Sequence, residues 1–499
     1  MCRPDGALNI VIAGAGPAGL LLTALLLQLN SESQTPRYKI TLVDNRQDFG
    51  LVKKEEMKNR FRSWMLGLAS HGIVALKEVD GLYEEYCKDV GVPLEGLSIH
   101  LGAKEIASNA SDDDLGENFI IDRNFIVAAI ARFVHDVSQD REAEYTALYE
   151  TSIMYVDYNN RRVLIRGTSG EGYLNYDLLV GCDGARSVVR EALVKRHSTF
   201  EMDVGDIFQT FKQTHIDRPK GVSPASMHLL PNGLPSMSGI ALPETGDKLN
   251  VSFGVPRHMF ETDDMPKELK SNDPKVVADF VKKNFKAFEM ADYDDFAQQW
   301  TSQKWNRTAQ VHCNYYHSTD INVVIMGDAA HATSPSIGMG MNQALKDAQT
   351  FYLLLKEHDD DLKVVLPSFS EIRVKEGNSL TDLAMHLYCL DTKHQLIETL
   401  HMVVRSALHG WFPSIIAQHP QNMIGRVEFS LSDVYQAAMD LGIIRKHRRI
   451  NADIRQKLFE DTTGMVRKNK KSLSLSQQFV IGGAVVTMGA IAVAFVSSS

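Results

Sequence analysis

The N-terminal part of the chain consists of an apolar run, a glycine-rich turn and a second apolar run. Residues Leu8–Ala13 are apolar, the turn GAGPAG covers Gly14–Gly19, and Leu20–Leu29 is again almost wholly apolar. This pattern predicts a buried strand, a tight turn and a helix, the first unit of a doubly wound α/β sheet. A secretion signal or membrane anchor would be similarly apolar, but the glycines and Pro17 inside the stretch favour a strand and a helix.

The middle of the chain, residues 198–317, has the pattern of short strands. Three runs, Met227–Pro231, Ser238–Pro243 and Leu249–Val255, are apolar or alternate apolar with polar residues, and a helix-like stretch, SNDPKVVADFVKKNF, follows them. We therefore expect a β-sheet with a packed helix in this region.

Helical periodicity replaces the strand pattern beyond Leu362. Within Gln395–Ala417 the apolar positions Leu396, Leu400, Val403, Leu408 and Trp411 lie near helical spacing. We expect this stripe to pack in the core, and the alternative is the lining of a lipophilic substrate entrance.

The C-terminal segment Phe479–Val496 contains 18 residues without a charge. As a helix it would be ~27 Å long, just enough for a hydrocarbon core of ~30 Å. Basic residues precede it and only Ser497–Ser499 follow, so we predict a tail anchor with the body of the protein in the cytosol. A buried core helix is the alternative for so short a stretch. The basic residues are Arg467, Lys468, Lys470 and Lys471.

Composition narrows the class of protein. The 499 residues are 44% hydrophobic and 23% charged, so the chain is long enough for several domains and gives no sign of disorder. The formal net charge of −9 argues against nucleic-acid binding. The five cysteines form no CxxC pair, which suits a reducing compartment and predicts no metal site.

The first glycine turn has the residues that a dinucleotide pyrophosphate requires. Gly14 permits the tight turn, Gly16 permits close approach of the phosphates beside Ala18, and Gly19 permits close helix packing. Asp44 ends the next apolar run and is placed to accept hydrogen bonds from a ribose. The gap between Gly14 and Asp44 exceeds the usual ~20 residues, and we attribute this to a polar insertion at Asn30–Arg37. Taken alone, the motif could be an unrelated glycine-rich loop.

Two further motifs complete a flavin cradle. The second, GCDGARSVVR, covers Gly181–Arg190, and the third, GDAAHATSPSIGMGMN, covers Gly327–Asn342. In the third, Asp328 follows a strand-like run and can bind the ribitol hydroxyls. The amides of residues 338–342 would face the pyrimidine end of the flavin, where reduction places negative charge. A simple βα turn with a capped helix would not explain this spacing, so we predict FAD as the cofactor.

With these motifs the chain resembles the single-component FAD-dependent aromatic hydroxylases, whose third motif has the form GDAAHxxxPxxGxGxN, and within them it is most similar to the kynurenine 3-monooxygenases. The resemblance also covers FRSWMLGLASHGIVAL (Phe61–Leu76), LPSFSEIR (Leu366–Arg373) and TDLAMHLY (Thr381–Tyr388). It implies a monooxygenase that uses NAD(P)H and O2 and acts through a flavin C4a-hydroperoxide. It suggests the outer mitochondrial membrane, although the sequence allows the endoplasmic reticulum equally.

The resemblance also implies roles for individual residues. It assigns Gly14, Gly16, Ala18 and Gly19 to the pyrophosphate loop, Asp44 and Arg46 to the adenosine ribose, and Arg123 to the FAD backbone. It further assigns Asp183 to flavin and NADPH contacts, and Asp328, Gly340, Met341 and Asn342 to the ribitol and isoalloxazine.

The expected substrate pocket departs from the family pattern. Where the kynurenine enzymes have an arginine before an Ile-His pair, this chain has Leu97 before Ile99 and His100, and Leu387 and Val434 replace an asparagine and a tyrosine. A leucine cannot replace an arginine that binds a carboxylate, so we expect a less charged substrate, aromatic or terpenoid. No catalytic acid or base is assigned. The alternatives are a true kynurenine 3-monooxygenase, a halogenase or reductase, and a non-catalytic tail-anchored flavoprotein.

The resemblance and the patterns together predict an α/β fold. We expect a discontinuous Rossmann-like FAD-binding domain of the GR2 type, a mixed-sheet substrate domain, a C-terminal helical region and a transmembrane tail helix. The predicted boundaries are 1–80, 110–197 and 318–360 for the first, 81–109 and 198–317 for the second, 361–470 for the third and 479–496 for the tail.

Overall fold

The computed structural model divides the chain into two compact units. The first unit is formed by Met1–Gly91, Ile121–Gly205 and Ala309–Thr381, and the second by the remaining segments, 92–120, 206–308 and 382–499. The structure describes residues 6–60, 64–109, 117–256, 265–387, 401–402, 404–406 and 408–463.

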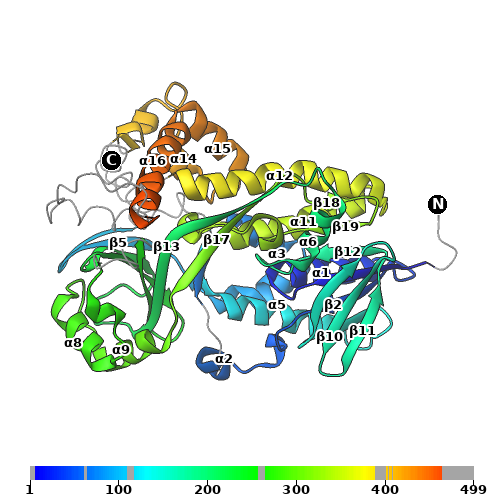
Figure 1. Ribbon diagram of the computed structural model, residues 1–499, viewed down its shortest axis with the longest axis horizontal. Coiled ribbons are helices and arrows are strands. Elements are labelled where there is room, and N and C mark those ends of the chain that lie inside the picture. Colours follow the sequence, from blue (N-terminus) through cyan, green and yellow to red (C-terminus); the bar gives the residue numbers. More distant parts are fainter. Residues whose placement is uncertain are drawn as a thin grey trace. The chain divides into compact units, whose positions relative to one another are not determined.

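A six-stranded sheet forms the centre of the first unit (Figure 1). Its order is β18-β19-β12-β1-β2-β8, and all neighbouring strands are parallel except the antiparallel pair β18 and β19. The Rossmann-like arrangement predicted from the first apolar runs is therefore confirmed. The strands are β1 (Leu8–Ala13), β2 (Tyr38–Val43), β8 (Tyr145–Leu148), β12 (Leu178–Gly181), β18 (His317–Ser318) and β19 (Val323–Ile325).

The burial of helix α1 (Pro17–Ser31) explains why its sequence is so apolar. It lies against α5 (Arg123–Val137) and α11 (Gly340–Glu357), and nearly every residue from Ala18 to Asn30 is buried. A helix that is covered on all sides is hydrophobic all round rather than amphipathic. The first unit also contains α2 (Lys54–Arg60), α3 (Ser70–Lys77), α6 (Val188–Arg196), α10 (Asp328–His331), most of α12 (Leu362–His386), and the short helices η1 (Phe49–Leu51), η2 (Leu82–Cys87), η3 (Lys88–Val90) and η5 (Pro335–Ile337).

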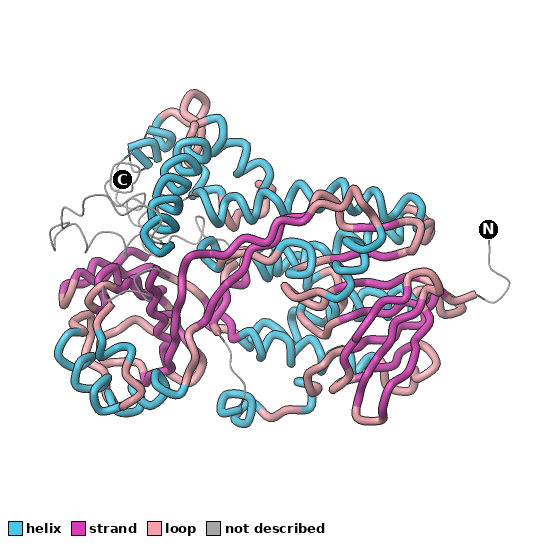
Figure 2. Tube along the Cα trace, in the orientation of Figure 1, coloured by secondary structure: helices cyan, strands magenta, loops and turns pink. Residues whose placement is uncertain are grey.

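Two small sheets accompany the central one. The strands β9 (Ser152–Asp157), β10 (Arg162–Gly167) and β11 (Gly170–Asn175) form an antiparallel meander and run side by side in Figure 2. The other small sheet has the order β3-β7-β4, with β3 at Met65–Leu68, β7 at Phe119–Asp122 and β4 at Val92–Pro93.

The second unit contains the sheet predicted for the middle of the chain. Its seven-stranded sheet has the order β17-β13-β16-β15-β14-β5-β6, and aromatic side chains, including Phe253, Phe296 and Trp300, pack beneath it in one apolar core with α8 (Pro274–Asn284) and α9 (Tyr293–Ser302). Short helix η4 (Lys267–Lys270) adds to this layer. The strands are β5 (Gly96–Leu101), β6 (Lys104–Asn109), β13 (Met202–Asp217), β14 (Ser226–Leu234), β15 (Met237–Glu244), β16 (Lys248–Pro256) and β17 (Asn306–Cys313).

The C-terminal part of the described chain is helical, as the periodicity predicts. The described residues between 401 and 411 are helical. They are followed by α14 (Pro420–Met423), α15 (Leu431–Asp440) and α16 (Ile443–Thr463). The expectation that the apolar stripe within 395–417 packs in the core is wrong for two of its residues, because Leu408 is 37% and Trp411 71% exposed. The other three, Leu396, Leu400 and Val403, lie outside the described residues. Periodicity locates an apolar face but does not decide what covers it.

The predicted membrane segment, Phe479–Val496, lies outside the described residues. Among the helices that the structure does describe, none combines the length and the apolar character that a membrane crossing needs.

Candidate functional site

The first glycine turn joins β1 to α1, and its three glycines meet different surroundings. Gly14 has a φ of +104°, and a Cβ there would lie 2.3 Å from the carbonyl oxygen of Cys182. A Cβ at Gly19 would lie 2.0 Å from the carbonyl oxygen of Gly14, whereas nothing lies within 4 Å of a Cβ at Gly16. Gly14 and Gly19 are therefore required by chain packing, and the space above Gly16 is open for a ligand.

The start of α1 is suited to an anion. Gly16 is its N-cap, Pro17 occupies the first turn, and no side chain caps the helix or places an acidic group in that turn. Unpaired N–H groups and the helix dipole make such a start a binding site for phosphate.

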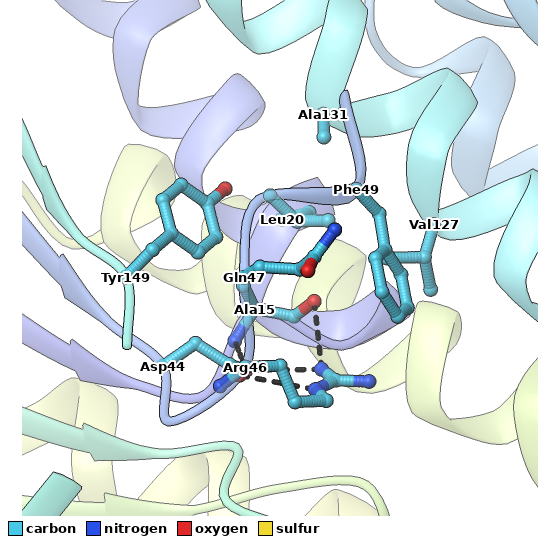
Figure 3. Close-up of a pocket in the computed structure, with 9 residues that line it drawn as sticks. All are labelled: Ala15, Leu20, Asp44, Arg46, Gln47, Phe49, Val127, Ala131 and Tyr149. Atoms are coloured by element: carbon cyan, nitrogen blue, oxygen red, sulfur yellow. Dashed lines mark hydrogen bonds and ion pairs between the residues drawn. The ribbon is translucent and has the colours of Figure 1, made fainter. Parts of the chain in front are cut away.

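Asp44, at the end of β2, is buried beside the glycine turn (Figure 3). One carboxylate oxygen accepts a hydrogen bond from the amide of Ala15 at 2.7 Å, and Arg46 donates to both oxygens, with its Nη2 2.9 Å from Oδ2. The two residues predicted for the ribose end of the cofactor thus form one ion pair next to the turn.

A small pocket lies beside this ion pair. Its walls combine Asp44 and Arg46 with an aromatic and aliphatic set that comes from η1, α1, α5 and the loop after β8 (Figure 3). No sequence motif identifies these aromatic and aliphatic residues, because they are far apart along the chain and come together only in the fold. They are Leu20, Phe49, Val127, Ala131 and Tyr149.

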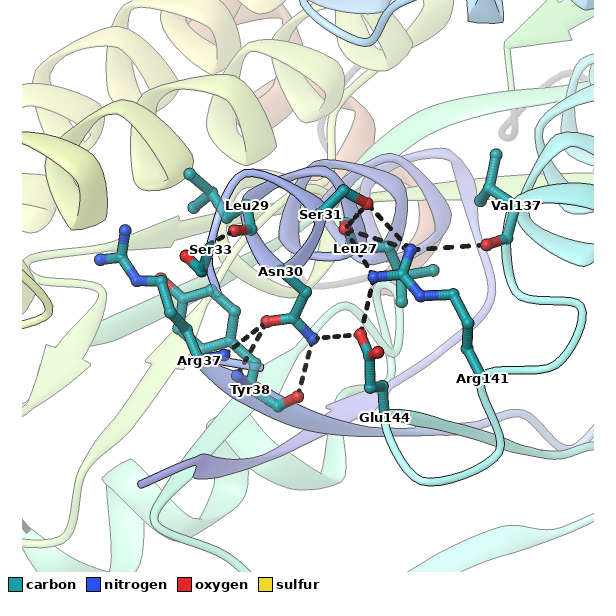
Figure 4. A network of polar contacts seen from close by, with 10 residues as sticks. All are labelled: Leu27, Leu29, Asn30, Ser31, Ser33, Arg37, Tyr38, Val137, Arg141 and Glu144. Atoms are coloured by element: carbon teal, nitrogen blue, oxygen red, sulfur yellow. Dashed lines mark hydrogen bonds and ion pairs between the residues drawn. The ribbon is translucent and has the colours of Figure 1, made fainter. Parts of the chain in front are cut away.

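The long interval between Gly14 and Asp44 also has a structural cause. Helix α1 continues to Ser31, and Asn30 at its end holds the return of the chain: its Oδ1 accepts from the amides of Arg37 and Tyr38, and its Nδ2 donates to the carboxylate of Glu144 (Figure 4). Arg141 donates to the same carboxylate at 2.7 Å. The polar stretch Asn30–Arg37 is therefore the end of a long helix and a fixed turn, which keeps Asp44 at the end of β2.

Arg123 begins α5 and lies in the same electrostatic environment as three other predicted residues. Its guanidinium carbon is 4.9 Å from the centre of the Trp64 ring. Burial lowers the pKa of Arg123, while Asp328 and Asp44 raise it and Arg46 lowers it. Arg123 is thus close enough to Asp44, Arg46 and Asp328 to interact with them through their charges.

Asp183 follows β12 and retains one unused acceptor. Its Oδ2 accepts from the amides of Val188 and Val189 at 2.7 and 3.2 Å. No donor among the described residues reaches its buried Oδ1. Burial raises the pKa of this carboxyl.

The third motif is held by a buried ionic network centred on Asp347, which lies outside the motif. Asp347, on α11, accepts from the amide of Gly327 at 2.7 Å, from His331 Nε2 at 2.6 Å and from Arg373 Nε at 2.5 Å. Burial raises the pKa of Asp347, but His331 and Arg373 outweigh it and lower the pKa to about 2. Gly327 has a φ of +60°, and the following residue, Asp328, is exposed with its carboxylate outside the network.

Asn342 is tied to the protein backbone rather than left open. Its Nδ2 donates to the carbonyl oxygens of Gly67 and Gly338 at 3.0 and 3.1 Å, and its Oδ1 accepts from the amide of Ala69 at 2.9 Å. Helix α11 starts at Gly340, just before Met341, without a capping side chain. Because the Asn342 side chain is engaged, a ligand at this helix start would meet main-chain amides.

These observations fit FAD. The first unit contains four features that a dinucleotide cofactor could use. They are the open space above Gly16, two uncapped helix starts, the unused oxygen of Asp183 and the exposed carboxylate of Asp328. Phosphates, ribose or ribitol hydroxyls and a ring that gains negative charge are the chemical groups such positions accept.

In the second unit, the residues predicted for the substrate pocket are buried. Leu97 on β5 is 4% exposed and packs with Leu229, while Leu387 is 2% and Val434 0% exposed. His100 is also buried and lies beside a second histidine. The hydroxyl of Tyr435, one place beyond the expected tyrosine, is 3.4 Å from Arg448.

The sheet order and the three loops are similar to the FAD-binding unit of FAD-dependent monooxygenases. A family model described as an FAD binding domain matches residues 136–360. The structure is similar to the 2-methyl-3-hydroxypyridine-5-carboxylic acid oxygenase, with a TM-score of 0.58 and 16% identity over 76% of this chain and 90% of that one. It is also similar to PqsL of Pseudomonas aeruginosa, with a TM-score of 0.56 and 18% identity over 77% and 96%.

Curated proteins give the same result at the level of sequence. The chain is 27% identical to the kynurenine 3-monooxygenase of Sus scrofa over 76% of this chain and 75% of that one. It is 23% identical to the kynurenine 3-monooxygenase of Saccharomyces cerevisiae over 87% and 92%. The predicted resemblance, the class of FAD-dependent monooxygenase and FAD as cofactor are therefore confirmed.

Proposed function

We propose that this chain is an NAD(P)H- and O2-dependent monooxygenase that hydroxylates or epoxidises an aromatic or lipophilic small molecule less charged than kynurenine. The first unit would hold FAD, and the second unit would supply the substrate pocket. When bound, FAD supplies the redox chemistry that links NAD(P)H to O2.

The chain's own residues would bind and orient the cofactor. Gly16 and the start of α1 would bind the pyrophosphate, Asp44 and Arg46 the ribose, and Asp328 the ribitol. Arg123 would bind the FAD backbone between them. The main-chain amides at the start of α11 would stabilise negative charge on the ring, where one well-placed donor contributes about 3 kcal/mol.

Asp183 has a separate proposed role. Its Oδ1 is buried and has no donor among the described residues, so an additional hydrogen-bond donor, from the flavin or the nicotinamide, would stabilise the fold as well as the complex.

The single observation behind the choice of substrate is the apolar character of the predicted pocket positions. Leu97, Leu387 and Val434 are buried and offer no hydrogen bond from their side chains. A carboxylate placed among such groups without a partner is strongly destabilised. An amino-acid substrate is therefore disfavoured, and a neutral ring or alkene is preferred.

The test is oxygen uptake and flavin reduction with the purified protein, NADPH and a panel of neutral aromatic compounds, terpenoids and kynurenine. We expect a neutral compound to accelerate flavin reduction and to yield a product heavier by one oxygen atom. Stoichiometric conversion of kynurenine to its 3-hydroxy product would contradict the substrate assignment. Bound FAD with no substrate-dependent oxygen uptake across the panel would count against turnover itself.

We also propose that Phe479–Val496 anchors the protein in a membrane, either the outer mitochondrial membrane or the endoplasmic reticulum. The support is the uncharged sequence and its basic flank. The exposed apolar side chains Trp411, Phe412 and Ile415 are consistent with a location near lipid.

Cell fractionation tests the anchor. The full chain should remain in the membrane pellet at high salt, and a chain that ends at Gln478 should not. If both are recovered in the supernatant, the anchor is wrong.

A further inference from the structure

Two histidines and a glutamate gather on three adjacent strands of the second unit. His100 lies on β5, Glu105 on β6 and His228 on β14. His100 Nε2 is 3.1 Å from His228 Nδ1, and Glu105 Oε1 lies 3.9 Å from the first nitrogen and 4.0 Å from the second. Within the described ranges, this is the one set of three such side chains whose ligand atoms come together.

The strand register alone brings these residues to one face of the sheet. His100 is paired directly with Glu105 on the antiparallel neighbour, and Ser98 is paired with His228 on the parallel neighbour. Residues two apart on a strand share a face, so Ser98 and His100 point the same way. The backbone therefore places the three residues next to one another on one face of the sheet.

The protonation of His228 is fixed by its surroundings. Its Nε2 is 3.1 Å from the carbonyl oxygen of Ser223, which can only accept a hydrogen bond. Nε2 therefore carries the proton, and in the neutral ring Nδ1 presents a lone pair to His100. This is the usual arrangement of a metal-binding histidine, whose other nitrogen donates to a backbone carbonyl.

Neither neutral form of His100 satisfies all of the buried nitrogens. With a proton on Nε2 it donates to His228, but its buried Nδ1 is then an acceptor that no described donor reaches. With a proton on Nδ1 it can interact with the backbone of Ala287, but two lone pairs then face each other at 3.1 Å beside a carboxylate. A cation between the two rings resolves the second arrangement.

We propose that His100, His228 and Glu105 bind a divalent transition-metal ion, with Zn²⁺ the best match to the donor set. Two nitrogens on a tetrahedral zinc lie about 3.3 Å apart, close to the observed 3.1 Å. Glu105 is exposed and its oxygen needs to move less than about 1 Å to reach the same spacing. Water would complete the shell.

The environment favours the ligand form of both rings. Burial lowers the pKa of His100 and His228, which favours the neutral form of each imidazole. The ring of Phe288 packs edge-on against His100, with 5.6 Å between their centres. If His100 binds a metal, it is not available to the substrate. The predicted substrate pocket then consists of Leu97, Leu387 and Val434.

Titration of the untagged, full-length, FAD-loaded protein with Co²⁺ tests the site, because tetrahedral cobalt has a distinct visible spectrum. We expect one Co²⁺ per chain, displaced by one Zn²⁺. Glu105→Gln and His100→Gln should each weaken binding by about tenfold or more. Glu95→Gln, an exposed carboxylate next to β5, is the matched control and should bind as the parent does.

A second readout separates loss of the metal site from loss of the fold. At one fixed Zn²⁺ concentration the melting temperature of the parent and of Glu95→Gln should rise by the same amount and that of Glu105→Gln by less, and all three proteins should retain the same FAD content. Absence of stoichiometric binding in the parent, or equal cobalt affinity in the parent and both ligand variants, would overturn the proposal. Neither result affects the proposed oxygenation, which does not depend on the metal.

Discussion

The first glycine turn and the third motif both present a helix start in the same unit, but they are stabilised differently. Gly14 and Gly19 are fixed by backbone atoms 2.3 and 2.0 Å from where a Cβ would stand. Gly327 is instead held by Asp347, which a histidine and an arginine stabilise in the core. The first site depends on the absence of side chains, and the second depends on a buried ionic network.

The largest effect should come from Asp347→Asn. The substitution removes the charge that pairs with His331 and Arg373 and leaves the buried guanidinium without its charged partner, a change that typically costs about 3–5 kcal/mol. We expect a fall of this size in the free energy of unfolding, measured with urea. Asp328→Asn in the same motif is the matched control, since that carboxylate is exposed. Equal stability of the two variants would show that the network does not hold the motif.

The pH dependence of this difference follows from the depressed pKa of Asp347. The carboxyl has a pKa of about 2 in the folded chain against 3.8 for the isolated group. Its stabilising contribution is therefore complete above about pH 4 and is lost as the pH falls toward 2. Urea unfolding of the parent and Asp347→Asn should give a constant difference near neutral pH that shrinks below pH 4. A difference that grew on acidification would contradict the assignment.

The glycine turn should show an intermediate effect that depends on position. Gly19→Ala forces a Cβ against the Gly14 carbonyl, and we expect a loss of about 3 kcal/mol in the free energy of unfolding. Gly16→Ala meets nothing within 4 Å and should lose less than about 1 kcal/mol. It should nevertheless weaken FAD binding about tenfold, measured by flavin fluorescence. If Gly16→Ala bound FAD normally, the open space above Gly16 would not be the pyrophosphate site.

The smallest effect on the fold should come from Asp328→Ala. An exposed residue outside the network should change the free energy of unfolding by less than about 0.5 kcal/mol. FAD retention during gel filtration should fall because the proposed ribitol acceptor is gone. A variant that is purified with full, equally tight flavin would remove Asp328 from the site.

The two helix starts also differ in what could be predicted from the sequence. Gly14, Gly16 and Gly19 are recognisable from their spacing, because backbone packing requires Gly14 and Gly19 and the approach of a ligand requires Gly16. Asp347 and Arg373 were not predicted, because a buried ion pair leaves no periodic or spacing signal. Phe49 and Tyr149 were not predicted either, because only the fold brings them to the pocket beside Asp44.

In the second unit the pattern of strands was predicted, but the cluster of His100, Glu105 and His228 was not. The cysteine content and spacing predicted no metal site, and that reasoning considers only residues close together in sequence. The pairing of β5 with both β6 and β14 is what joins the three side chains, and strand partners cannot be read from alternation alone.

Asn342 joins two stretches that are far apart along the chain. Its side chain connects the carbonyl of Gly67 and the amide of Ala69 to the carbonyl of Gly338. We expect a fluctuation that releases the loop before α11 to disturb the hydrogen bonds of the Asn342 side chain, which also hold the end of β3. Hydrogen exchange at Ala69 should consequently report how often that loop opens, although the two segments are far apart along the chain.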